Sequence, residues 1–434
     1  MSGAAQPGTR TGPNPWYIAV IAGMASYLDA ATIVSSGNAL VIYQETLGIT
    51  GDQIGVLSAV LTLGIAVGAM TGGRLGDRYG RKPVFSVTMV GIIIAMACNV
   101  FATGFPLLLV GAILGGLSTG ADLPVSIATV SEAANDRNRG KLVGFSQVLW
   151  TMGILVPLAL TSVIGDLGRV GGQIIFGSVG VVALIVLVLR IALPESSVWL
   201  AARDERRRGV HTERAEHVRV GDLLKKPYAV PFICLLIFYP LVNLAANTGG
   251  QFGTYLWVNN AGSTVEFAAR ISLVGYGVVL VLALVFMRVV DTRWRMPIFY
   301  FGAACYVLST LIPTVVGVTV ATLLAWSLLS AVAQAFAFEA ILKVWTQESF
   351  PTLLRSTAQG TIISVARVLA AVLGLVTPRL AAAGPRGLFL VLTVLIAIGM
   401  AAAIFAFRRG TRNEFDIEAE EVDETGFAHP HPAH

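Results

Sequence analysis

Long apolar runs separated by short polar segments dominate this chain. A helix needs about 20 consecutive apolar residues to cross the hydrocarbon core of a bilayer. Runs of about that length number twelve: 17–40, 53–72, 84–103, 106–131, 141–164, 172–193, 228–257, 268–290, 297–316, 318–347, 357–380 and 387–407. The pattern predicts an all-α membrane protein with twelve transmembrane helices. The segment before Trp16 is polar and rich in Pro and Gly, so we expect no cleaved signal peptide.

Basic residues gather in the loops on one side of the predicted spans. Loops after even-numbered spans are cationic, within 74–82, 137–141, 203–226, 288–295 and 408–412. Loops after odd-numbered spans hold few Lys or Arg residues. Because cationic loops are retained in the cytoplasm, we expect both termini to be cytoplasmic and the protein to lie in the plasma (inner) membrane.

Composition agrees with a membrane protein, since 55% of the residues are hydrophobic and only 13% are charged. The formal net charge is +5, although the tail after Arg412 contains acids and no Lys or Arg. The positive surplus lies in short loops on alternate sides of the spans, so it does not indicate nucleic acid binding. The expected partner of this apolar surface is a lipid bilayer, and we expect a monomer.

The most specific motif lies between the second and third runs and reads Gly72-Gly73-Arg74-Leu75-Gly76-Asp77-Arg78-Tyr79-Gly80-Arg81-Lys82. Its glycines allow two helix ends to approach closely, and Asp77 can lie at the N-terminus of a neighbouring helix. The motif resembles the signature loop between helices 2 and 3 of the major facilitator superfamily. This resemblance implies a membrane transporter built from two pseudo-symmetric six-helix bundles.

The longest hydrophilic segment follows the sixth run and divides the chain. We predict an N-terminal six-helix bundle over 1–193, a cytoplasmic loop over 194–227, a C-terminal six-helix bundle over 228–407 and a disordered acidic tail over 408–434. The loop begins Pro194-Glu195-Ser196-Ser197-Val198-Trp199-Leu200, which resembles a sequence of the sugar-porter and organic-ion branches, with Val198 replacing an arginine. A weaker copy of the signature loop at 291–297 suggests that the halves are parallel repeats.

Charges at the basic helix ends are candidates for ion-pair latches that close this side of a transporter in one state. The resemblance places such charges in both signature loops and after helices 4 and 10. The candidate latch residues are Gly73, Asp77, Arg78, Arg81, Glu132, Arg139, Asp291, Arg295, Glu348 and Arg355. The alternative is that these charges are simply solvated at helix ends.

A few charges fall inside the apolar runs, where each needs a cavity, a partner or a function. Asp29 lies midway along the first run, and Asp122 lies about 15 Å from the end of the fourth. We expect both to face a central cavity, where desolvation helps a carboxyl to bind a proton. The resemblance agrees, because a helix-1 aspartate couples protons in many sugar porters. Likewise, Gly120-Ala121-Asp122-Leu123-Pro124-Val125-Ser126 is similar to a segment of proton-phosphate symporters. The alternative for Asp29 is a structural hydrogen bond to the backbone.

The sugar-porter pattern supplies no partner for Asp29 here, because Gly111-Ala112 replaces its usual Gly-Arg pair. Arg367 and Lys343 are the only cations that we place deeply enough to pair with it. Glu339 lies four residues before Lys343, so the two share a helix face and can pair. Glu339 is thus a third candidate for proton coupling, and the alternative is a self-neutralising pair without a substrate role.

Polar residues on two runs predict the lining of a substrate site. A stripe on the seventh run consists of Asn243, Asn247, Gln251 and Tyr255, which recur every four residues. Pro240, Gly249, Gly250 and Gly253 are expected to break this helix. On the fifth run, Gln147 and Trp150 lie in a segment that is similar to a sugar-binding motif. Together with Lys343 and Arg367, these are the predicted substrate-binding residues.

We interpret the chain as a proton-coupled symporter that takes up a small polar metabolite, such as a sugar, polyol or organic acid, by alternating access. The alternatives are a proton-coupled efflux antiporter of organic ions or drugs and a non-transporting nutrient sensor. We expect no enzyme, because the sequence contains no phosphate loop and no nucleophile with a plausible base. No cofactor or metal site is expected either, and Cys98, Cys234 and Cys305 lie singly within apolar runs.

Overall fold

The computed structural model describes residues 15–133, 139–193, 195, 200, 223–290, 292–350 and 352–408, and these residues form helices without a β-strand. The first group of helices is α1 (Pro15–Leu47), α2 (Gly51–Tyr79), α3 (Arg81–Val100), α4 (Phe105–Ala133), α5 (Arg139–Ile164) and α6 (Arg169–Ile191). The second group is α8 (Ala229–Asn259), α9 (Val265–Val289), α10 (Arg295–Val316), α11 (Val320–Ala337), α12 (Glu339–Ser349), α13 (Thr352–Ala383) and α14 (Pro385–Phe407).

The helices confirm the prediction of an all-α polytopic membrane protein. In the described part of the chain, 11 helices are long and apolar enough to cross a membrane. The shorter apolar segment Val148–Ile164 of α5 supplies the remaining predicted run. One candidate span, Val320–Thr346, comprises α11 and most of α12. This span is interrupted at Phe338, whose backbone leaves the helical conformation.

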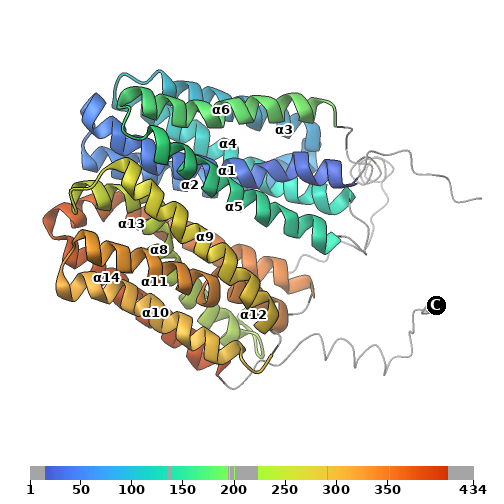
Figure 1. Cartoon of the computed structure of the whole chain (residues 1–434). Coiled ribbons are helices and arrows are strands. Elements are labelled where there is room, and N and C mark those ends of the chain that lie inside the picture. Colours follow the sequence, from blue (N-terminus) through green and yellow to red (C-terminus); the bar gives the residue numbers. More distant parts are fainter. Residues whose placement is uncertain are drawn as a thin grey trace, which may run out of the picture.

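Helices α1–α6 pack mainly on one another, and so do α8–α14. Figure 1 shows the first group (blue to green) above the second group (yellow to red). Contacts between the groups run chiefly from α2 to α13, from α5 to α9 and from α1 to α8. The predicted boundaries at 194–227 and 408–434 stay predictions, because most of both segments lies outside the described residues.

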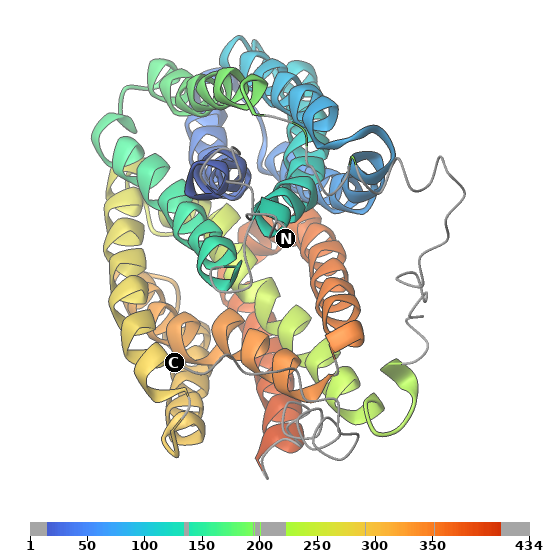
Figure 2. The same ribbon diagram turned by 90° about the vertical axis from the view of Figure 1, so that its right-hand side faces the viewer.

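The bundle has two chemically different ends. We call the end where α1 begins, α2 meets α3 and α14 finishes the basic end, because it carries Arg78, Arg81, Arg293 and Arg408. The opposite end, where α1 meets α2 and α8 meets α9, is called the far end. Figure 2 views the bundle from the basic end, with α5 lying beside α9.

Close contacts at the far end join the two groups of helices. A Cβ atom added at Gly37 of α1 would lie 2.9 Å from the Gln251 carbonyl oxygen of α8. One added at Gly55 of α2 would lie 2.9 Å from the Leu375 carbonyl oxygen of α13. Since real Cβ atoms do not approach oxygen so closely, glycine allows these backbones to meet. Small residues are the usual means of close helix packing in membranes.

The prediction that glycines and Pro240 break the seventh span is wrong. Helix α8 runs without interruption from Ala229 to Asn259, with Pro240 inside it. A helical glycine costs only about 1 kcal/mol relative to alanine, whereas an unpaired backbone group in hydrocarbon costs several kcal/mol. Keeping the helix intact is therefore the cheaper solution, and the break occurs in the tenth span instead.

Candidate functional site

A buried ion pair joins the two groups of helices near the middle of the bundle. Asp29 of α1 and Arg367 of α13 approach to 3.6 Å between Oδ2 and Nη2, and their side chains are 1% and 25% exposed. The other carboxylate oxygen of Asp29, Oδ1, is buried and has no hydrogen-bond partner among the described residues. The structure thus pairs Asp29 with Arg367, one of the two candidate partners, but it leaves half of the carboxylate unsatisfied.

Three other predicted site residues lie around this pair. Trp150 of α5 and Glu339 of α12 both lie close enough to act on the Asp29 carboxylate. Glu339 also forms the predicted ion pair with Lys343, at 2.8 Å between Oε1 and Nζ. The acidic residues Asp29 and Glu339 and the basic residues Arg367 and Lys343 therefore lie close together, just beyond the break at Phe338. A proton or a charged group that binds here changes the electrostatic interactions among these four side chains.

The polar stripe on α8 lies farther from the basic end and connects the two groups of helices. Gln251 donates from Nε2 to the Thr62 hydroxyl of α2 at 2.9 Å and to Asn247 Oδ1 at 2.6 Å. One turn beyond, the Thr254 hydroxyl donates to Asn38 Oδ1 of α1 at 2.5 Å. These side chains hold the halves together, which is a role that the sequence did not predict for Gln251.

The remaining members of the predicted binding set are dispersed. Tyr255 lies at the far end, where its hydroxyl would be 2.7 Å from a Cβ atom at Gly51. Asn243 lies beside Tyr239, on the part of α8 that faces Glu339 and Arg367. Gln147 belongs to α5, but its side chain lies outside the described residues. The predicted substrate-binding residues are therefore spread along the bundle and do not line a single pocket.

The expectation that Asp122 faces a central cavity is wrong. Its side chain is 1% exposed and forms an ion pair with Arg190 of α6, which is also 1% exposed in its side chain. The Thr88 hydroxyl of α3 donates to Asp122 at 3.0 Å. The partners all belong to α3, α4 and α6, so Asp122 is enclosed by the first group of helices.

Arg190 is a buried cation that the sequence analysis did not identify. The prediction that only Arg367 and Lys343 lie deep within the spans is therefore wrong. Besides Asp122, Arg190 contacts Ser126 Oγ at 3.1 Å and the Ala22 carbonyl oxygen of α1 at 2.9 Å. Its guanidinium also lies 4.4 Å from the ring centre of Phe85. An arginine inside the sixth apolar run was the available signal. The contacts tie α1, α3, α4 and α6 together within one half.

Some predicted latch residues have described partners at the basic end. Arg295 pairs with Glu348 at 2.8 Å, which joins the start of α10 to the end of α12. The Arg81 and Lys82 backbone N–H groups donate to the Glu195 carboxylate at 2.9 and 3.2 Å. Glu195 thereby satisfies free donors at the start of α3, as anions commonly do at helix N-termini.

The other latch predictions stay predictions. The Arg78 guanidinium lies 5.3 Å from the ring centre of Tyr79, and a Cβ atom at Gly73 would lie 3.9 Å from Pro124. The side chains of Asp77, Glu132, Arg139 and Arg355, and the whole of Asp291, lie outside the described residues.

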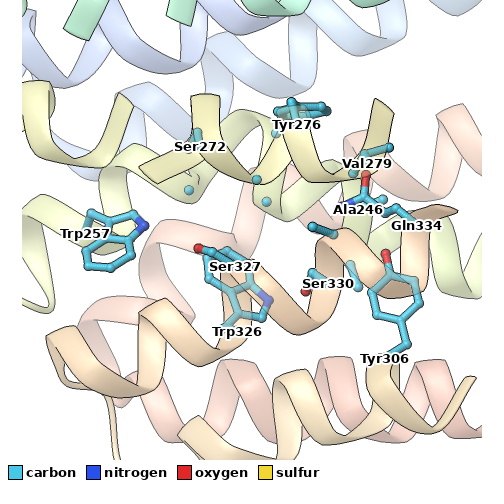
Figure 3. Close-up of a pocket in the computed structure, with 16 residues that line it drawn as sticks. Ala246, Trp257, Ser272, Tyr276, Val279, Tyr306, Trp326, Ser327, Ser330 and Gln334 are labelled. Carbon is cyan, nitrogen blue, oxygen red and sulfur yellow. The ribbon is translucent and has the colours of Figure 1, made fainter. Parts of the chain in front are cut away.

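A cavity of about 70 Å³ lies within the second group of helices, between α8, α9, α10 and α11. Its lining includes Gly250 and Gly253 of α8, Tyr276 of α9, Tyr306 of α10 and Trp326 of α11. Figure 3 shows these walls and the hydroxyl and amide groups among them. The α8 residues that line it lie on a different face from Asn247 and Gln251. We call this space the α8–α11 cavity.

Comparisons with known proteins agree with this architecture. The family model of the Major Facilitator Superfamily matches residues 18–375. The minor myo-inositol transporter of Bacillus subtilis (strain 168) is 32% identical over 369 residues, which cover 83% of each chain. The putative niacin/nicotinamide transporter of the same organism is 23% identical over 360 residues, 80% of this chain and 84% of that one.

A solved structure shows the same fold. The crystal structure of a D-xylose-proton symporter superposes with a TM-score of 0.71 at 19% identity, covering 90% of this chain and 96% of that chain. The chain therefore belongs to the major facilitator superfamily. It is a polytopic membrane transporter and not an enzyme, because the family and these relatives are transporters.

The Asp122–Arg190 pair gives the first testable prediction. Arg190→Met should lower the free energy of unfolding by about 3–5 kcal/mol, because the Asp122 carboxylate would stay buried without its cation. Adding Asp122→Asn to Arg190→Met should restore part of that loss. Denaturant unfolding of the purified protein in detergent measures both effects, with the exposed Arg386→Met as the control. Strictly additive losses in the double variant would show that the two side chains are not coupled.

Proposed function

We propose that this transporter takes up a small polar metabolite together with a proton, by alternating access. The observation that carries the proposal is the Asp29–Arg367 pair, which is the deepest described ion pair between the two groups of helices. A proton on Asp29 would neutralise its carboxylate and weaken the attraction to Arg367. The ionisation of one side chain would thereby bias the position of α1 relative to α13.

Contacts at the far end support alternating access. The described polar contacts between the groups include Arg379–Asp52 at 2.8 Å and Gln44–Asn259 at 3.2 Å, both near the far end. These contacts, with Gly37 and Gly55, close that end in this conformation. If the basic end is cytoplasmic, this conformation faces inward. The cycle then needs an opposite state in which these contacts break and the basic end closes.

The nature of the cargo is supported by the relatives. The protein that is 32% identical is named for myo-inositol, and another relative is named for niacin and nicotinamide. All three compounds are small polar metabolites, and this chain carries polar side chains on α8 and a cavity on a neighbouring face of that helix. Localisation in the plasma (inner) membrane with cytoplasmic termini, and a monomeric state, belong to the same proposal.

The coupling role of Asp29 gives the second prediction. Asp29→Asn should abolish uphill accumulation of radiolabelled myo-inositol in proteoliposomes under an imposed pH gradient, because the side chain can no longer exchange a proton. Exchange of the solute between the two sides should persist. The matched variants Asp122→Asn and Glu339→Gln rank the other acids. Undiminished gradient-driven accumulation in Asp29→Asn would contradict the assignment, and accumulation against the proton flow would indicate an antiporter.

The latch at the basic end gives the third prediction. We propose that Asp77 and the neighbouring arginines help to close the basic end in the opposite state, so Asp77→Asn should favour the conformation described here. Spin labels at the exposed positions 79 and 294, in a chain without native cysteines, report the separation across the basic end by pulsed electron resonance. Asp77→Asn should increase the population with a long separation.

Gly55→Leu provides the opposite control, because a larger side chain there disturbs closure of the far end and should shorten the separation. An unchanged distance distribution in Asp77→Asn, together with a shift in Gly55→Leu, would reject the latch.

A further inference from the structure

The α8–α11 cavity carries no ionisable carboxylate, ammonium, guanidinium or imidazole in its walls. None of its 16 lining residues is Asp, Glu, Lys, Arg or His. Its polar groups are neutral and include the hydroxyls of Ser272, Ser327 and Tyr276 and the side-chain amide of Gln334. Burying a net charge without a counter-ion is strongly unfavourable. A ligand that enters the cavity is therefore favoured when it is uncharged and rich in hydrogen-bonding groups.

The Tyr306 hydroxyl is a buried polar group that a ligand in the cavity can satisfy. Its side chain is 1% exposed, and the hydroxyl has no hydrogen-bond partner among the described residues. Figure 3 shows this hydroxyl turned toward Ala246 and Gln334, which also line the cavity. A buried hydroxyl that lacks a partner is unfavourable, and a ligand hydroxyl can serve as both donor and acceptor for it.

Helix α8 presents a bare backbone wall on the other side of the cavity. Cβ atoms added at Gly250 and Gly253 would meet nothing within 4 Å, so these glycines border open space. At Gly249 the nearest atom would be Trp326 Cζ2, at 3.5 Å. A ligand can thus approach the helix backbone at Gly250 and Gly253, whereas Gly249 packs directly against Trp326. Apolar ring faces with polar edges suit such a site.

The cavity is separate from the charged pair but close to it in the structure. Tyr276, which lines the cavity, packs on the same small cluster as Trp150, the neighbour of Asp29. That cluster includes Ala30, the residue after Asp29. A solute in the cavity can therefore displace the packing beside Asp29 without touching its carboxylate.

We propose that the α8–α11 cavity is a substrate subsite for an uncharged, polyhydroxylated small molecule and that it rejects carboxylates. This inference rests on the proposed transport function. The proton and the solute then occupy different places, with Asp29 and Arg367 serving the proton and Tyr306, Gln334 and Trp326 serving the solute. Solute binding is then coupled to protonation of Asp29 through the packing of Tyr276 and Trp150 against α1.

The test measures binding to the purified full-length chain in detergent, by thermal shift followed by titration calorimetry. The uncharged probes are myo-inositol and D-xylose, and the carboxylate probes are D-glucuronate and nicotinate. We expect an uncharged probe to raise the melting temperature, since a ligand that binds the folded state stabilises it. The carboxylates should give no shift. Stabilisation by a carboxylate and by no uncharged probe would overturn the proposal.

Variants locate the binding site. Tyr306→Phe should raise the dissociation constant of the bound probe about tenfold, because the ligand loses a hydrogen bond. Gly253→Val should raise it at least about tenfold by filling the cavity. The matched control is Gly277→Val on α9, where an added Cβ also meets open space but lies outside the lining. Unchanged dissociation constants in both cavity variants, with intact folding, would place the site elsewhere.

This experiment is independent of the proton-coupling proposal. Binding is measured without a membrane or a gradient, so a failure of Asp29-dependent uptake leaves the binding result intact. Conversely, a protein that does not prefer uncharged probes over carboxylates can still use Asp29 for proton coupling.

Discussion

Charges buried within a membrane must be paired, and this chain pairs them in two structurally different ways. Asp122 and Arg190 lie within one group of helices, where further hydrogen bonds from Thr88 to Asp122 and from Arg190 to Ser126 extend the network. Such a pair can stay intact while the halves move. Asp29 and Arg367 instead belong to different halves, so movement of one half against the other must change their separation. Of these two pairs, the second is therefore the one through which we propose that the ionisation of Asp29 biases the conformation.

Polar contacts of α8 join the two groups of helices between the charged pair and the closed far end. Gln251 links α8 to α2, and Thr254 links α8 to α1. A different face of the same helix lines the α8–α11 cavity. The unbroken helix α8 can thus transmit a change at the cavity to the contacts that close the far end. The tenth span breaks at Phe338, between the cavity wall on α11 and the charged residues of α12.

Features that depend on local sequence were predicted well. Apolar runs of membrane length gave the helices, and the four-residue spacing of Glu339 and Lys343 gave their ion pair. Arg367 and Lys343 were the two candidate partners of Asp29, because few cations lie deep in the spans, and Arg367 is the one that pairs with it. The motif at 72–82 gave the family, which the family model confirms.

Features that depend on convergence of distant helices were not predicted. The partners of Arg190 come from α1 and α4 of the same half, and their spacing along the chain carries no periodic signal. The cavity is lined by scattered serines, glycines and tyrosines, which resemble ordinary packing residues in a sequence. Continuity of α8 was missed because glycine and proline also occur inside intact transmembrane helices, where neighbouring groups satisfy the freed backbone atoms.

Infrared difference spectroscopy during a pH titration of the purified protein tests the central claim most directly, because it detects protonated carboxyl groups without any substrate. We expect a protonated-carboxyl band that titrates in the wild-type protein and in Asp122→Asn, and that is absent from Asp29→Asn. A band that persists in Asp29→Asn and disappears in Asp122→Asn or Glu339→Gln would contradict the assignment of the proton to the carboxylate that joins the two halves.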